Sequence, residues 1–151
     1  MEHVSTDDVE AGGMSDADVR GLAGPLGTED VAINHYTLAP GERFSGGLHT
    51  HMDQEEVFYV LSGEATFETL DGEVAVGAGE AIRFAPGEYQ SGKNAGDEPV
   101  TALALGAPKD SEDVRVPQEC RDCGHENMRA VPGDDGFTLV CPECGTEVTP
   151  T

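Results

Sequence analysis

Two histidines and a glutamate near the middle of the chain have the residue types and spacing of a metal site. His49 and His51 are two residues apart, and Glu56 follows five residues later at the start of an apolar run. Residues i and i+2 share one face of a strand, so both imidazoles can point to one place. Glu56 has the opposite parity, and the polar stretch 52–55 offers a turn that resets the register. This ligand set suits Fe²⁺, Mn²⁺, Ni²⁺ or Zn²⁺.

Short strands are predicted around this motif. Apolar and β-branched runs bounded by turn residues indicate strands at Val31–Ala39, Glu56–Leu61, Glu64–Leu70, Glu73–Val76, Ala81–Phe84 and Val100–Leu105. The Asp71–Gly72 pair between two of these runs indicates a hairpin. Many short strands without a long amphipathic helix are typical of an all-β barrel or jelly roll.

The spacing His49-x-His51-x4-Glu56-x6-Gly63 resembles the first conserved motif of the cupin superfamily. The segment 79–90 resembles the second motif in the placement of its glycines and proline, as does the asparagine at position 94. The resemblance covers about residues 21–106. It implies a cupin-type double-stranded β-helix, a jelly-roll barrel that binds a divalent metal and a small molecule, and a homodimer.

Gln90 stands where this family usually carries its third metal-binding histidine. A glutamine amide oxygen is a weaker ligand than imidazole and is no general base near neutral pH. The metal is then held by His49, His51 and Glu56 alone, or Gln90 completes a weaker four-ligand site, or the barrel has lost its metal and binds an organic ligand. Because the other three ligands are intact, a retained metal is favoured.

The four cysteines of the chain form two Cys-x-x-Cys pairs. Cys120 and Cys123 are separated from Cys141 and Cys144 by seventeen residues, a spacing expected of a structural zinc site. Short strands are predicted at Asn127–Val131 and Phe137–Val140, and the whole resembles a zinc ribbon. Two disulfides are the alternative, but the acidic N-terminus has no secretory signal. Structural Zn²⁺ is therefore the favoured interpretation.

The charge balance predicts the salt conditions in which the protein works. The chain has 30 acidic residues against 8 basic ones, a formal charge of −22 over 151 residues. Such self-repulsion opposes folding at low salt and is screened at molar salt. The composition resembles that of cytoplasmic proteins of salt-in halophiles, of the haloarchaeal type. No apolar run is long enough to span a membrane, and the ribbon lacks the basic stripe that nucleic-acid binding needs.

Composition divides the chain into four predicted segments. These are a flexible acidic tail at 1–20, a cupin barrel at 21–106, a linker at 107–118 and a zinc ribbon at 119–151. The tail is rich in Asp, Gly and Ser, and the linker combines prolines with mixed charges.

Two classes of function follow from these predictions. The first is a metal-dependent enzyme acting on a small molecule, either an oxygenase or an isomerase. The alternative is a non-catalytic ligand-binding or regulatory cupin whose ribbon docks a protein partner. Arg83 is a candidate for holding an anionic substrate, although a surface ion pair is favoured for it. Tyr89 and Phe58 are further pocket candidates, with core packing as the alternative for Phe58.

Overall fold

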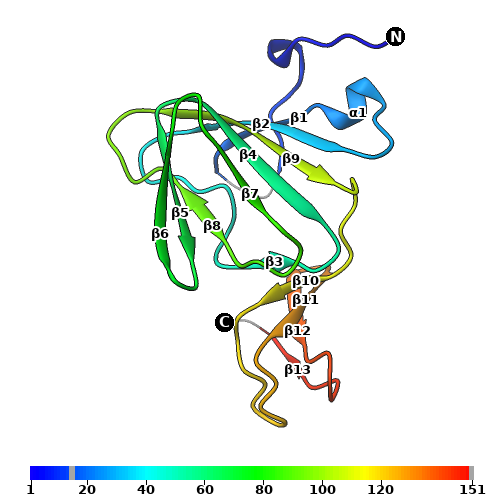
Figure 1. The fold of residues 1–151 in the computed structure, drawn as a ribbon. Helices are drawn as coiled ribbons and strands as arrows, with labels where there is room; N and C mark the ends of the chain where they lie inside the picture. Colours follow the sequence, from blue (N-terminus) through cyan, green and yellow to red (C-terminus); the bar gives the residue numbers. More distant parts are fainter. Residues whose placement is uncertain (14–15, 150–151) are drawn as a thin grey trace.

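Strands with alternating apolar residues build two sheets in a computed structural model that describes residues 1–13 and 16–149. The first sheet has the order β1-β2-β9-β4-β7 and the second the order β6-β5-β8 (Figure 1). Their strands are β1 (Asp18–Gly21), β2 (Ala32–Leu38), β4 (Glu55–Ser62), β5 (Glu64–Thr69), β6 (Gly72–Gly77), β7 (Ala81–Phe84), β8 (Ser91–Lys93) and β9 (Val100–Ala107). Six of them confirm the predicted strands to within two residues at each end.

The core lies between these two sheets and centres on phenylalanines. Phe67 of β5 is fully buried, and its ring centroid lies 4.9 Å from that of Phe58 on β4. The rings of Phe44 and Phe84 each lie 5.6 Å from Phe67. Because both sheets contribute to one apolar cluster, the predicted all-β barrel is confirmed.

A third sheet contains the cysteine-rich C-terminal part, and one strand of the barrel region joins it. Its order is β13-β12-β11-β10-β3, and Figure 1 shows this module (yellow to red) beside β3. The strands are β3 (Thr50–His51), β10 (Val114–Val116), β11 (Met128–Gly133), β12 (Gly136–Val140) and β13 (Glu147–Val148). Met128 and Leu139 form a small second core together with Cys120 and Cys141.

Two segments predicted to lack regular structure contain strands. Within the predicted tail 1–20, β1 pairs with β2, and Gly12 N–H donates to Val19 O at 2.8 Å. Residues 14–15 of that tail lie outside the described part of the chain, as do residues 150–151 of the predicted ribbon. Within the predicted linker 107–118, β10 pairs with both β3 and β11. β10 pairs with β3, which is distant in sequence, and β1 lacks an alternating apolar pattern. Composition alone therefore did not reveal either strand.

Helices are few. The described residues contain a one-turn 3-10 helix, η1 (Thr6–Asp8), and one short helix, α1 (Ala23–Leu26), before β2. Neither is long or apolar enough to cross a membrane.

Candidate metal and ligand site

His49, His51 and Glu56 meet at one end of the barrel. β3 ends at His51, a turn follows at 52–53, and β4 begins at Glu55, so the register is reset as the sequence predicts. One ligand atom from each of the three residues lies within 4.8 Å of the others. His51 Nε2 is 3.0 Å from Glu56 Oε1. Nitrogen and oxygen ligands at about 2.1 Å from a metal lie roughly 3.0–3.5 Å apart, so this donor set fits a divalent ion.

Hydrogen bonds fix which nitrogen of each imidazole faces the site. His49 Nδ1 lies 2.8 Å from Gly47 O, and a carbonyl oxygen only accepts, so Nδ1 carries the proton. His51 Nδ1 lies 3.0 Å from Ser111 Oγ, which itself donates to Asp53 Oδ1 at 2.6 Å. The serine oxygen therefore accepts from His51. Both Nε2 atoms keep a free lone pair, as metal-binding histidines require.

Burial and hydrogen bonding shift two pKa values around the site. Burial lowers the pKa of His49 below its ordinary value, and the carbonyl of Gly47 offsets this only in part. The hydroxyl of Ser111 lowers the pKa of Asp53, as do backbone N–H groups including that of Glu112. A neutral His49 and an ionised Asp53 are the states that favour a bound cation.

Gln90 contacts Glu56 through its amide nitrogen. Gln90 is 3% exposed and lies opposite His49 in an isolated antiparallel bridge. Its Nε2 donates to Glu56 Oε2 at 2.9 Å, while its Oε1 has no hydrogen-bond partner among the described residues. Turning the amide over would bring its oxygen against the carboxylate. In this arrangement the amide nitrogen of Gln90 orients the carboxylate of Glu56, and its Oε1 is left without a protein partner among the described residues.

A cavity of about 370 Å³ opens beside the three ligands. Phe58 lines it, as the sequence predicts for a pocket residue, and so do Tyr36, Asn34 and Lys109. The phenol of Tyr36 has a raised pKa because it is buried and, secondarily, because Glu56 is near. It therefore remains a hydrogen-bond donor at neutral pH.

Arg83 and Tyr89 do not line this cavity. They border a separate hollow of about 420 Å³ between the β5–β6 hairpin and β7. Arg83 lies opposite Val57 in the β4–β7 pair, one residue out of step with Glu56, and therefore on the outer face. There it pairs with exposed Glu55. Of the three predicted pocket residues, Phe58 is the one that lines the cavity beside His49, His51 and Glu56.

The loop 107–113 forms a wall of the cavity that sequence analysis missed. Gln54, buried in the turn between the ligands, donates from Nε2 to Pro108 O at 2.8 Å and to Lys109 O at 3.3 Å. Met52 N–H donates to Asp113 O at 2.8 Å. These bonds join residues more than fifty positions apart, so no local pattern announces them. The sequence shows only that a glutamine lies between His51 and Glu56, and its burial is evident from the structure alone.

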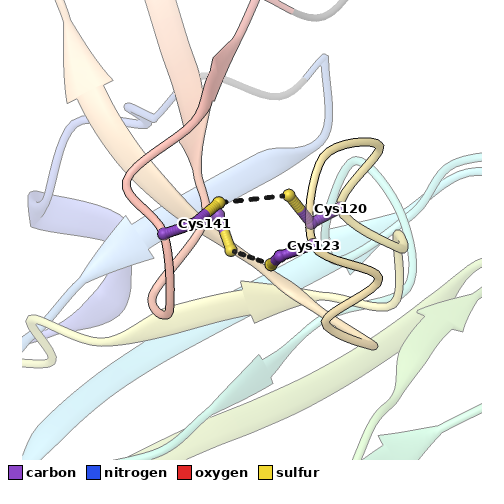
Figure 2. Close-up of side chains that lie close together, drawn as sticks. Cys120, Cys123 and Cys141 are labelled. Atoms are coloured by element: carbon purple, nitrogen blue, oxygen red, sulfur yellow. Dashed lines mark hydrogen bonds between the residues drawn. The ribbon is translucent and has the colours of Figure 1, made fainter.

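The four cysteines converge as the spacing predicts. They are free thiols, and all four sulfurs lie within 4.8 Å of one another. Cys120 Sγ is 3.6 Å from Cys144 Sγ, and Cys123 Sγ is 3.5 Å from Cys141 Sγ. Figure 2 shows the labelled side chains directed toward one another from two loops. Sulfurs around a tetrahedral zinc at about 2.3 Å lie about 3.8 Å apart, so the cluster fits Zn²⁺.

The two cysteine loops have the same backbone design. Gly124 N–H donates to Cys120 O at 2.9 Å, and Gly145 N–H donates to Cys141 O at 3.0 Å. Both glycines have positive φ, 73° and 78°, which a side chain would disfavour. The hydroxyl of Thr146, 3.2 Å from Cys144 Sγ, and its backbone N–H lower the pKa of Cys144 to about 6. A lowered pKa favours the thiolate, which is the form that binds a cation.

Comparisons with known proteins agree with the barrel. Residues 34–106 match the family described as Cupin domain. A curated relative, the oxalate-binding protein of Thermotoga maritima, is 35% identical over 68 residues, which are 45% of this chain and 54% of that protein. The chain thus spans about half the length of this relative.

Solved structures resemble the chain over a longer stretch. A sugar phosphate isomerase of the cupin superfamily from Silicibacter pomeroyi has a TM-score of 0.73 at 21% identity, covering 97% of this chain and 96% of that one. The polyketide cyclase RemF of Streptomyces resistomycificus has a TM-score of 0.64 at 25% identity, covering 81% of this chain and 89% of that one. Residues 34–106 therefore match the cupin domain, and the chain has the double-stranded β-helix fold of cupins.

Proposed function

We propose that this protein binds a divalent metal in its barrel and acts on a small molecule held in the cavity beside it. The observation that carries the proposal is the convergence of His49 and His51 with Glu56, both imidazoles having Nδ1 engaged and Nε2 available. A bound metal would polarise an oxygen of the substrate or activate dioxygen. Fe²⁺, Mn²⁺, Ni²⁺ and Zn²⁺ all suit this ligand set.

The protein's own groups would bind and orient the substrate. Tyr36 presents a neutral phenol to the cavity, and Phe58 supplies an apolar wall. Gln90 holds one carboxylate oxygen of Glu56, which leaves the other toward His51. The named neighbours include an isomerase and a cyclase, and one cupin fold supports several chemistries. An isomerase or oxygenase is therefore proposed as a class, without a named substrate.

The alternative is a ligand-binding cupin without catalysis, which the name of the oxalate-binding relative favours. A ribbon that served only to dock a protein partner would also support this alternative. Here β10 continues the ribbon sheet onto β3, next to the metal ligands. The ribbon can therefore have a structural role beside the proposed metal site, and its presence in an enzyme does not require a docking partner.

We further propose that the cysteine cluster holds one structural Zn²⁺, that the protein works in a salt-rich cytoplasm, and that it forms a homodimer. Exposed apolar side chains on β4 and β6, such as Tyr59, Leu61 and Val74, are available for a second copy. Light scattering would test the dimer.

Raising KCl from about 0.1 M to about 1 M shortens the Debye length from about 10 Å to about 3 Å. The urea midpoint of unfolding should rise over this range, and a flat profile would argue against halophilic adaptation.

Elemental analysis of the purified chain tests the barrel metal. Wild type, prepared without chelator, should contain zinc at the ribbon plus a second metal. Glu56→Gln and the double variant His49→Ala/His51→Ala should lose only the second metal. Glu55→Gln is the matched control, because Glu55 is the neighbouring carboxylate but pairs with Arg83 on the outer face. Equal metal content in all four proteins, even after added Fe²⁺ or Mn²⁺, would refute the barrel site.

A further inference from the structure

One basic residue differs from all the others in its surroundings. The chain has 8 lysines and arginines among 30 acidic residues. Seven of the eight lie within 4.0 Å of a carboxylate oxygen, namely Arg20, Arg43, Arg83, Lys93, Arg115, Arg121 and Arg129. In the described part of the chain Lys109 has no such partner. With so many carboxylates available, an unpaired ammonium is an exception that calls for a reason.

Lys109 lines the same cavity as the metal ligands. It shares that cavity with His49, His51 and Glu56. Oε2 of Glu56 accepts from Gln90 Nε2 at 2.9 Å, and Oε1 lies 3.0 Å from His51 Nε2, on the side of the proposed metal. Glu56 therefore serves the proposed metal site, and Lys109 lines the cavity without pairing with a carboxylate of the described residues.

The position of Lys109 is fixed by the surrounding structure. Gln54 donates from Nε2 to Pro108 O and to Lys109 O, which holds the backbone of the loop. Gly106 permits this contact, because a Cβ there would lie 2.8 Å from Gln54 Nε2. Lys109 Nζ donates to Thr28 O at 3.1 Å. An ammonium has three protons, so further donors remain for a ligand.

We infer that Lys109 binds an oxyanion group of the substrate, a carboxylate or a phosphate, while another part of the molecule faces the metal ligands. The inference rests on the proposed function in placing the substrate in this cavity. Tyr36 and Asn34 line the same space as neutral polar partners. A charged hydrogen bond in a partly enclosed site discriminates strongly against a neutral analogue, because the lone ammonium then stays unpaired.

Calorimetric titration of the full chain tests this assignment. Oxalate is compared with neutral oxamide, and glucose 6-phosphate with glucose, so that the responding pair identifies carboxylate or phosphate. The variants are Lys109→Met, which keeps most of the stem, and Lys109→Arg, which keeps the charge. Lys93→Met is the matched control, because it removes the other lysine, which pairs with Glu68 and Glu73 away from the cavity. Circular dichroism and metal content are recorded for each protein.

Wild type should bind one anion at least about tenfold more tightly than its neutral analogue. Lys109→Met should lose that preference, while Lys109→Arg and Lys93→Met should retain most of it. Unchanged binding by Lys109→Met, equal losses in both methionine variants, or no anion binding by metal-loaded wild type would overturn the inference and leave the metal site standing. If wild type holds no barrel metal, the proposed function fails, and the same comparison on the metal-free chain still decides the role of Lys109.

Discussion

His51 lies directly opposite Val114 in an antiparallel pair that joins the barrel to the cysteine-rich module. Val114 belongs to β10, which also pairs with β11 of the ribbon hairpin, Val114 opposite Ala130. A proposed metal ligand of the barrel and the hairpin between the two cysteine loops therefore belong to one sheet. Backbone hydrogen bonds fix the position of one strand relative to the next. We therefore expect the structural order of the ribbon strands to affect the position of His51.

The first prediction is that loss of the ribbon zinc weakens the barrel metal. Cys123→Ser should remove zinc, loosen the ribbon sheet and lower the affinity of the barrel for its metal by about tenfold. Titration of Mn²⁺ or Fe²⁺ into the variant measures this affinity, with zinc content recorded separately. Thr138→Ser, a change on β12 away from the cysteines, is the control. Barrel affinity equal to wild type in a zinc-free variant would show that the two sites are independent.

The second prediction concerns the relay from Asp53 through Ser111 to His51. Ser111→Ala removes the acceptor of the His51 Nδ1 proton, so the ring can rotate or change tautomer. Outer partners of this kind typically contribute about 10- to 100-fold to metal affinity. Metal affinity should fall within that range, while zinc in the ribbon stays. Ser62→Ala, which removes an exposed hydroxyl bonded to Thr101, should leave both metals in place. Equal affinities in the two serine variants would exclude the relay.

The barrel strands and the ligand pairs could be predicted because their signals are local. The alternation in Glu64–Thr69 and the His49-x-His51 spacing each occupy a few consecutive residues, and the structure places them as the pattern indicates. The cavity wall could not be predicted in this way. Lys109 and Ser111 reach the site through contacts with residues 28, 51 and 53. Their stretch of prolines and charges is typical of a linker, and only the tertiary contacts give it another role.

The surface ion pair favoured for Arg83 is confirmed by its contact with Glu55. β7 presents Arg83 one residue out of step with Phe84, whose ring faces the core. The alternation of Ile82, Arg83 and Phe84 already separates the arginine from the two apolar residues, because neighbouring residues of a strand point to opposite faces.

The third prediction tests the packing of the barrel at Gly92. A Cβ at this position would lie 2.6 Å from ring atoms of Phe44 and of Phe67, two members of the aromatic core. Gly92→Ala should therefore destabilise the fold by about 1–3 kcal/mol through overpacking. Urea unfolding at high salt measures the loss. Gly96→Ala is the control, because the nearest atom to its Cβ would lie 3.6 Å away. A loss of similar size in both variants would mean that backbone freedom, and not contact with the rings, is responsible.

The fourth prediction separates the roles open to Gln90. If Gln90 orients Glu56, then Gln90→Leu leaves a buried carboxylate oxygen without its donor, and barrel metal affinity should fall by about tenfold. Gln90→His should raise the affinity above wild type, because imidazole is a stronger ligand than an amide and the position lies beside His49. Metal titration of the two variants against wild type measures both effects. Gln90→Glu serves as the third arm. Its carboxylate repels that of Glu56 in the metal-free protein, and a bound cation relieves this repulsion. Affinity that is the same in the leucine, histidine and wild-type proteins would place Gln90 outside the metal shell, as a core residue whose contact with Glu56 carries no chemistry.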